Sequence, residues 1–306
     1  MLILSTPTAA GATARAATRQ AWAHNLPTRP CVARFWFVLG STGHMSNSEV
    51  LSSGQLERES DLLFVDAPEG YRNVTRKVLA AFDWLVHRQP MHFEYVFKTD
   101  DDAFICVGGL LRVLRRQRPL YAGLAVPPQR VIVLPGHRWQ DLAYAKVFRR
   151  RMYLDYFQGL GYALRMELVR TVIANADRLG LWTSDPPPAN EDAWVGALAR
   201  TQHNGAGASV GSVLPINRSL AVEALLPAAQ WISRENTTRA CAAGYLMVHK
   251  LAPRELLTCA EAAAAAPPYC HLRTNGRVPR GGEWWMHPPR SAGGSERCSC
   301  DAAATR

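Results

Sequence analysis

The sequence lacks any apolar run long enough to cross a membrane, and Met1 to Ser5 is too short for a signal peptide. It also lacks the paired C-x-x-C spacing of a zinc site and any zinc-finger or RNA-binding signature. These absences disfavour a membrane-spanning protein and a zinc-dependent nucleic-acid-binding protein. We expect either a soluble chain or one from which an amino-terminal anchor is missing.

The composition is that of a folded protein. Of the 306 residues, 48% are hydrophobic and 20% are charged, which excludes a largely disordered chain. We predict one large domain over residues 1–274 and a tail rich in Gly, Pro and Arg over residues 275–306. The net charge of +10 indicates an anionic partner, for which nucleic acid, a membrane surface, a nucleotide diphosphate and an acidic glycan all qualify.

The cysteines and the possible N-glycosylation sites indicate the compartment in which the protein folds. Three N-x-S/T triplets, which begin at Asn73, Asn217 and Asn236, are compatible with secretory passage. The spacing of the cysteines favours disulfides in an oxidising compartment over metal binding. The seven cysteines are Cys31, Cys106, Cys241, Cys259, Cys270, Cys298 and Cys300.

Hydrophobic periodicity predicts alternating strands and helices over the first two thirds of the chain, so the fold class is α/β. Strands are expected at Leu2–Ser5, Ala33–Leu39, Leu62–Val65, Phe93–Thr99, Tyr121–Leu124 and Tyr162–Leu164. Helices are expected at Thr13–His24, Thr75–Arg88, Gly109–Arg118, Met166–Arg178 and Glu191–Leu198. The Ala-rich run Ala260–Ala266 is compatible with another helix.

Three consecutive acids, Asp100, Asp101 and Asp102, follow the strand that ends at Thr99. Ligands of open α/β sheets bind at the carboxyl ends of the strands. Carboxylate oxygens are ligands of Mg²⁺ and Mn²⁺, and such a cation is suited to bridging a diphosphate. The alternatives are a solvated turn or a helix cap; a phosphatase of the Asp-x-Asp-x-Thr type is disfavoured because Phe104 takes the threonine position.

Further candidate groups lie downstream. Glu191 and Asp192 open an apolar helix, where they either stabilise its amino terminus or supply a general base for an acceptor hydroxyl. Gly159 and Gly161 allow backbone to approach a ligand or simply form a turn. His249 is either a single imidazole ligand or a histidine without a special role.

Six motifs in this order and spacing resemble the β-1,3-galactosyltransferase family, of the glycosyltransferase family 31 type. The resemblance covers residues 2 to 200, and the carboxy-terminal motifs look most like the branch of galactosyltransferase II of the glycosaminoglycan linkage region. The six motifs are Arg19–Trp22, Phe37–Gly40, Tyr71–Lys77, Lys98–Asp102, Gly159–Tyr162 and Glu191–Gly196. The carboxy-terminal motifs are Gly244–Lys250 and Cys298–Cys300.

The resemblance implies a GT-A fold with a mixed, mostly parallel sheet, UDP-α-galactose as the donor, Mn²⁺ as the cation and a β-1,3 linkage to a glycan or glycoprotein. It implies a Golgi-lumenal enzyme anchored by a membrane span that this sequence lacks, with no nucleic-acid partner. By motif, the metal ligands are Asp100, Asp102 and His249, the catalytic acids are Asp192 and Glu191, and the nucleotide is contacted by Arg19, Asp66, Lys77, Asp100 and Asp101.

The sequence departs from the family at two places. Gly159-Leu160-Gly161 replaces a run of three glycines, and Trp194 stands where a smaller residue is common, so Trp194 is expected to reshape the acceptor pocket. Three rival interpretations stay open: UDP-N-acetylglucosamine as the donor, a non-catalytic glycan-binding relative, and a nucleic-acid-binding protein suggested by the charge.

Overall fold

A computed structural model describes residues 1–23, 33–41, 61–89, 92–126, 129–137, 139–201, 213–215, 221–222, 241–242 and 246–265. The predictions that concern the tail over residues 275–306 lie outside the described residues. So do those on Asn217, Asn236, Cys31, Cys270, Cys298, Cys300 and the first two residues of the Gly244–Lys250 motif. Among the described residues, no helix combines the length and the apolar character needed to cross a membrane.

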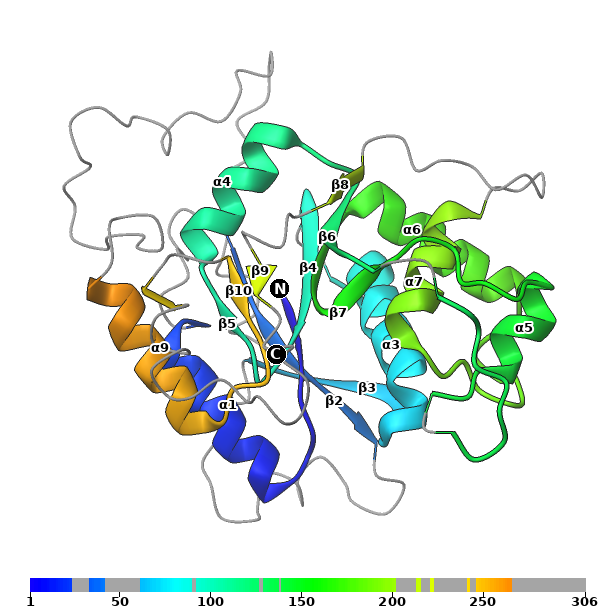
Figure 1. Cartoon of the computed structure of the whole chain (residues 1–306), viewed down its shortest axis with the longest axis horizontal. Coiled ribbons are helices and arrows are strands. Elements are labelled where there is room, and N and C mark those ends of the chain that lie inside the picture. Colours follow the sequence, from blue (N-terminus) through cyan, green and yellow to red (C-terminus); the bar gives the residue numbers. More distant parts are fainter. Residues whose placement is uncertain are drawn as a thin grey trace.

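A seven-stranded sheet forms the centre of the molecule, in the order β3-β2-β1-β4-β7-β6-β8 (Figure 1). Neighbouring strands are parallel, except that β7 runs antiparallel to both β4 and β6. The predicted α/β fold with a mixed, mostly parallel sheet is therefore confirmed. The strands are β1 (Leu2–Leu4), β2 (Trp36–Ser41), β3 (Leu62–Pro68), β4 (Tyr95–Asp100), β6 (Tyr121–Ala125), β7 (Phe157–Arg165) and β8 (Val213–Pro215).

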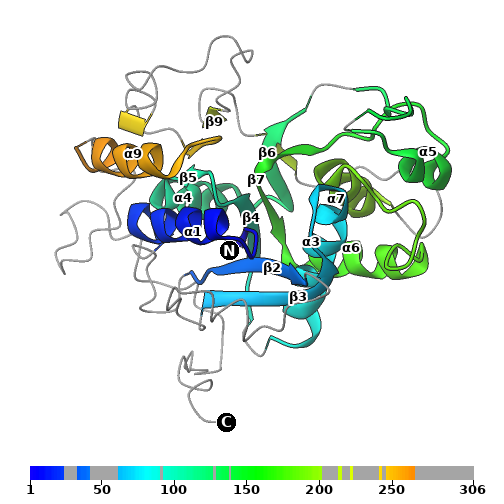
Figure 2. The same cartoon turned by 90° about the horizontal axis from the view of Figure 1, so that it is seen from below.

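Helices cover both faces of the sheet (Figure 2). One core contains buried side chains of α3 (Val74–His87), α6 (Met166–Arg178) and α7 (Glu191–Arg200). The other core contains those of α1 (Ala9–Ala21), α4 (Val107–Gln117) and α9 (Pro253–Ala265). Because successive side chains of a strand point to opposite faces, Leu2 and Leu4 enter the first core while Ile3 enters the second.

Strands β1, β2, β3 and β4 run in the same direction, so their carboxyl ends meet at one edge of the sheet. Ser5, Ser41, Glu69 and Asp100 lie at or just beyond those ends. Helix α1 starts from the same edge, where the Thr8 hydroxyl caps it by accepting from the Gly11 N–H at 3.1 Å. Polar side chains from four separate segments are thus gathered at one edge.

A second sheet brings a late segment of the chain to this edge. Strand β10 (Met247–Val248) pairs antiparallel with β5 (Phe104–Ile105) and parallel with β9 (Ala221–Val222). The Leu251 N–H donates to the Asp102 carbonyl at 2.9 Å, so the chain stays beside the acidic turn after β10 ends. His249 is consequently held next to the acids that follow β4.

The predicted disulfide chemistry is confirmed for three of the cysteines. Cys241 and Cys259 form a disulfide, which ties the segment before β10 to α9, and Cys106 is also disulfide-bonded. Helix α9 in turn lies beside α1 in both views (Figures 1 and 2). The carboxy-terminal part of the described chain is therefore attached to the first helix and to the acidic edge.

Candidate active site

The acidic triplet lies in a tight turn between β4 and β5, where its members take different roles. Asp100 is the last residue of β4, and its carbonyl accepts from the Ala103 N–H at 3.3 Å. Asp101 is turned toward β1: its N–H donates to the Leu4 carbonyl at 3.0 Å, and its carboxylate accepts from the Ser5 hydroxyl at 2.6 Å. Asp100 and Asp102 are left to face His249.

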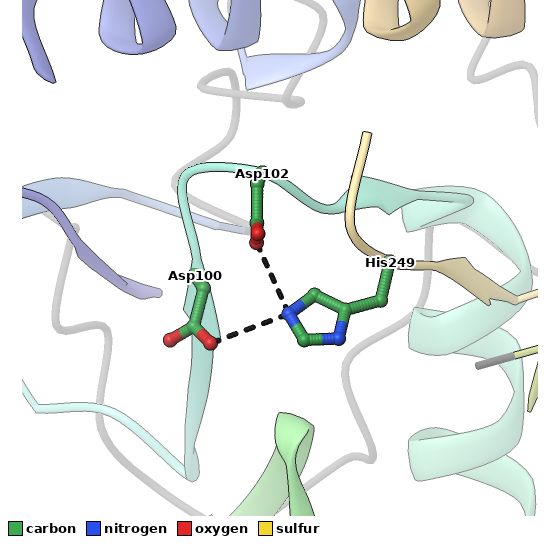
Figure 3. Close-up of side chains that lie close together, drawn as sticks. All are labelled: Asp100, Asp102 and His249. Carbon is green, nitrogen blue, oxygen red and sulfur yellow. Dashed lines mark ion pairs between the residues drawn. The ribbon is translucent and has the colours of Figure 1, made fainter. Parts of the chain in front are cut away.

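One imidazole nitrogen of His249 lies between two carboxylates (Figure 3). His249 Nε2 is 3.0 Å from Asp102 Oδ1 and 3.4 Å from Asp100 Oδ2. One ligand atom from each of the three residues lies within 4.8 Å of the other two. Two oxygens and one nitrogen therefore converge on a single point from the strand end, the turn and the segment after β10.

The charges in this cluster respond to one another. Burial alone would lower the pKa of His249, but Asp100 and Asp102 outweigh it and raise that pKa to about 9. Burial alone would raise the pKa of Asp100, but Lys98 and His249 outweigh it and hold the pKa below its usual value. Two neighbouring carboxylates thus form an anionic site that favours a positive charge between them.

The residues of this cluster fit a divalent cation. His249 Nδ1 is buried without a hydrogen-bond partner among the described residues, and buried Asp102 Oδ1 has its ion pair with His249 Nε2 at 3.0 Å. Two carboxylates that share one imidazole nitrogen leave oxygen lone pairs that a cation would satisfy. Carboxylate oxygens with one imidazole nitrogen suit Mn²⁺ and related hard or borderline cations.

Lys98 connects the cluster of Asp100, Asp102 and His249 to the other predicted acids, Glu191 and Asp192. This lysine is 2% exposed, and its ammonium lies 2.8 Å from Asp100 Oδ1, 3.3 Å from Glu191 Oε2 and 2.7 Å from the Gly159 carbonyl. Burial alone would lower the pKa of Lys98, but the Asp100 and Glu191 charges outweigh it and raise that pKa. A permanent positive charge therefore sits between the strand-end acids and the first turn of α7.

Glu191 is buried and Asp192 is half-buried. Glu191 accepts a short hydrogen bond from the Tyr162 hydroxyl and pairs with Lys98, so both of its oxygens have partners. Asp192 accepts from the Gly159 N–H at 3.0 Å and from the Ala193 N–H at 2.9 Å. The two adjacent acids thus differ, since Glu191 is enclosed and Asp192 is the more accessible.

The pKa of Asp192 lies well above that of a solvated aspartate. Burial is the largest cause and the negative charge of Glu191 adds to it, while Lys98 opposes both, and the resulting pKa is about 7. A carboxylate with such a pKa accepts a proton readily near neutral pH, which a general base requires. At Gly159, a Cβ atom would lie 3.4 Å from Lys98 Nζ and 3.6 Å from Asp192 Oδ2, so this glycine lets the backbone approach both groups.

The predicted nucleotide-contacting residues are distributed along the same edge and beyond it. Lys77 is buried; it pairs with Glu69 at 2.7 Å and donates to the Ser5 carbonyl, which places it near Asp101. Asp66 is exposed on β3. Arg19 makes a bidentate ion pair with Asp61, at 2.8 Å to each oxygen, near the end of α1 farther from this edge.

Trp194, which the sequence predicts to reshape the acceptor pocket, lies in the core of the protein. The indole is fully buried, because its N–H donates to Asp141 at 2.9 Å and its rings pack against Tyr144 and Phe148. Any influence of Trp194 on the site must pass through Asp141 and the segment around α5 (Leu142–Phe148).

Sequence reasoning missed several residues that organise this edge. The motifs give Lys98 no role of its own, although a lysine inside an apolar strand is itself a signal of a buried ion pair. Glu69 accepts from both Lys77 and the Gly40 N–H, and Arg15 donates to the Ser5 hydroxyl at 2.9 Å. None of these three contacts leaves a periodic signal in the sequence.

Comparison with known proteins bears directly on this arrangement. A family model described as Galactosyltransferase matches residues 13–203, which is more than half of the chain. The chain belongs to the galactosyltransferase family. The matched range contains Asp100, Asp102 and Asp192, whereas His249 comes from beyond it. The predicted family is confirmed.

Curated relatives carry the names of two transferase types. The chain is 34% identical over 155 residues to beta-1,3-galactosyltransferase 6 of Mus musculus, a match that covers 49% of this chain and 46% of the relative. It is 30% identical over 152 residues to UDP-GalNAc:beta-1,3-N-acetylgalactosaminyltransferase 2 of Danio rerio, covering 49% of this chain and 29% of the relative. The matches therefore span about half of these relatives or less, and the linkage-region branch stays a prediction.

Solved structures resemble this galactosyltransferase-family chain more distantly. The galactosyltransferase LgtC, in complex with donor and acceptor sugar analogues, has a TM-score of 0.39 and 13% identity, covering 87% of this chain and 98% of that one. Mouse xyloside xylosyltransferase 1 has a TM-score of 0.37 and 10% identity, covering 81% and 96%. Likeness at this level is too low to bear on the reaction.

Proposed function

We propose that this chain is the catalytic domain of an inverting hexosyltransferase with a GT-A fold. It transfers galactose from UDP-α-galactose to a hydroxyl of a glycan or glycoprotein acceptor in β-1,3 linkage. The observation that carries the proposal is that Lys98 contacts both Asp100, of the carboxylate–imidazole cluster, and Glu191, the neighbour of Asp192. The two parts that a metal-assisted transfer requires therefore lie on either side of one ammonium group.

Asp100, Asp102 and His249 would hold the cation, which we propose to be Mn²⁺. When bound there, the cation would bind the diphosphate and offset the negative charge that develops on the leaving UDP. Lys98 keeps Asp100 ionised and in position, and Ser5 fixes Asp101 beside it. We propose Lys77, Asp66 and Asp101 as residues that contact or frame the nucleotide, as the family resemblance implies. Arg19, which the resemblance also implies, is not proposed as a contact because Asp61 holds it near the end of α1 farther from this edge.

Asp192 acts as the general base. Its carboxylate accepts the proton of the acceptor hydroxyl while that oxygen attacks the anomeric carbon, and the bond between that carbon and the diphosphate oxygen breaks, its electron pair leaving with UDP. Attack opposite to the leaving group inverts the configuration from α to β. The Gly159 N–H holds Asp192 in position, and we assign Glu191 to the positioning of Lys98 and Tyr162 rather than to proton transfer.

The protein acts, on this proposal, in an oxidising compartment such as the Golgi lumen. Two features support it: the family, and the Cys241–Cys259 disulfide. The type of membrane attachment found in the family, through an amino-terminal anchor, is part of the same proposal.

The decisive experiment incubates the purified chain with Mn²⁺ and a panel of sugar donors, with mass spectrometry of galactosyl, xylosyl and peptide acceptors. UDP-galactose should give a product one hexose heavier, and digestion with a linkage-specific β-galactosidase should remove it. UDP-N-acetylglucosamine tests the rival donor expected from the sequence. UDP-N-acetylgalactosamine tests the donor sugar that appears in the name of the Danio rerio relative. A non-catalytic relative would bind UDP without forming any product, which would refute the proposal.

A further inference from the structure

Most of the exposed large hydrophobic side chains of the described residues come from one stretch of the chain. Five of them lie between positions 133 and 152, and the sixth, Tyr71, contacts one of these five; the set is Tyr71, Val133, Leu134, Trp139, Leu142 and Met152. Within it, the rings of Tyr71 and Trp139 meet edge to face, with centroids 5.1 Å apart. These two rings are 41% and 40% exposed, so each offers a large part of its surface to solvent.

Tyr71 is attached to the side of the site that we assign to the nucleotide. It begins the short 3-10 helix η3 (Tyr71–Asn73), which leads into α3. One residue, Gly70, separates Tyr71 from Glu69. Glu69 pairs with Lys77, and Lys77 also donates to the Ser5 carbonyl beside Asp101. Tyr71 therefore lies two residues after Glu69, from which a series of contacts leads through Lys77 and Ser5 to the acidic turn.

Trp139 is attached to the side that carries the proposed base. Two residues later, Asp141 accepts from the Trp194 indole at 2.9 Å and from the backbone N–H groups of Ala189 and Asn190. Two extended residues span at most about 7 Å. Asn190 directly precedes Glu191 and Asp192, so Trp139 is two residues away from a side chain that is hydrogen-bonded to the start of α7.

We propose that Tyr71 and Trp139 form a subsite for an acceptor sugar ring other than the one that receives galactose. One face of a pyranose presents C–H bonds, which pack well on the electron-rich face of an aromatic ring. Aromatic side chains give such contacts a large area with little loss of side-chain entropy. One ring belongs to the segment linked to the donor side and the other to the segment linked to the base side, so on this proposal a longer acceptor held at Asp192 extends toward the pair. This inference rests on the proposed function.

The positions of the rings favour a sugar over an apolar protein partner. The aromatic pair is the part of the exposed region that is connected to both halves of the site, whereas Leu134, at 64% exposure, lies in the segment before Trp139. A partner that used the whole apolar region would need Leu134 as much as Trp139. Leu134→Ala is therefore the matched control for Trp139→Ala.

The test compares two probes with the same reacting end, methyl β-galactoside and methyl β-lactoside, in the presence of UDP-galactose and Mn²⁺. In the unaltered chain, kcat/KM should be higher for the lactoside because its second ring adds a contact. Trp139→Ala should lower the lactoside-to-galactoside ratio by about tenfold, the upper range expected of one stacking contact. Trp139→Phe, which keeps a ring, should retain most of the ratio, and Leu134→Ala should leave it unchanged.

Saturation-transfer NMR of methyl β-lactoside reads the contact of its glucose ring without requiring turnover. Signal on that ring in the unaltered chain and its loss in Trp139→Ala support the subsite. An absent signal, an unchanged ratio in Trp139→Ala, or an equal loss in Leu134→Ala overturns it, the last result indicating an apolar partner. Failure of the unaltered chain to release UDP from UDP-galactose in any assay refutes the proposed function instead, and the NMR result still decides the subsite.

Discussion

The ionisation of Asp192 should control the rate of transfer at low pH. Burial and the adjacent Glu191 raise its pKa to about 7, against the opposing effect of Lys98. A general base works only when it is deprotonated, so activity should be full above this pKa and fall as the pH drops through it. One pH unit below the pKa of Asp192, about a tenth of the Asp192 side chains are ionised. With each further unit of decrease in pH, kcat/KM should fall about tenfold.

Two substitutions separate this effect from other titrations. Asp192→Asn keeps the size of the side chain but cannot accept the proton, so turnover should fall by about 10²- to 10⁴-fold while UDP binding in Mn²⁺ is retained. Glu191→Gln removes the negative charge next to Asp192, so the pKa of Asp192 should fall and the acid limb of the profile should move to lower pH. Glu167→Gln, at an exposed carboxylate on α6, should change neither.

The assay measures UDP release from UDP-galactose with acceptor between pH 5 and pH 9, and calorimetry follows UDP binding at each pH. Binding must be followed because protonation of the acidic cluster would also reduce activity. Three results would each refute the reasoning: substantial turnover by Asp192→Asn, an acid limb near the pKa of a solvated aspartate, and an unshifted limb in Glu191→Gln.

Three further predictions concern the cation and the stability of the fold. Asp102→Ala should raise the Mn²⁺ concentration for half-maximal turnover at least about tenfold, and an unchanged titration would exclude Asp102 as a ligand. Lys98→Met should lower the free energy of unfolding in urea by about 3 kcal/mol or more, because Asp100 and Glu191 lose their buried cation; an unchanged midpoint would contradict this. Replacing Cys241 and Cys259 by serine should cost about 3 kcal/mol, given their separation of 18 residues, and a loss below about 0.5 kcal/mol would count against the cross-link.

Local patterns predicted most of the central fold. The helix expected at Met166–Arg178 has those bounds in the structure, because its apolar positions recur at helical spacing and strand β7 ends directly before it. Helix α1 begins at Ala9 rather than at Thr13 because Thr8 caps it, a short signal that the Ala-rich composition obscured. The sequence predicts the position of the acidic turn because the three acids directly follow a buried strand.

Local sequence patterns do not predict that His249 lies next to Asp100 and Asp102. It depends on β10 and β5, which are strands of two residues each, from positions more than 140 residues apart in the chain. Strands this short carry no periodicity. Only the family motif placed the histidine near the acids, and the pairing of Val248 with Phe104 is the physical reason for that placement.

The strand pattern predicts one partner of Lys98, whereas the packing of other elements decides the others. Residues two apart on a strand share a face, so a lysine between Phe97 and Thr99 in an apolar strand already predicts a pairing with Asp100. The same pattern cannot predict Glu191, because that contact depends on how α7 packs against β7. Yet a fully buried ammonium beside a single carboxylate would leave donors unsatisfied, so further partners are required. The Gly159 carbonyl and Glu191 meet that requirement. Because the Gly159 N–H also donates to Asp192, these contacts set the position of Asp192 relative to Asp100, Asp102 and His249.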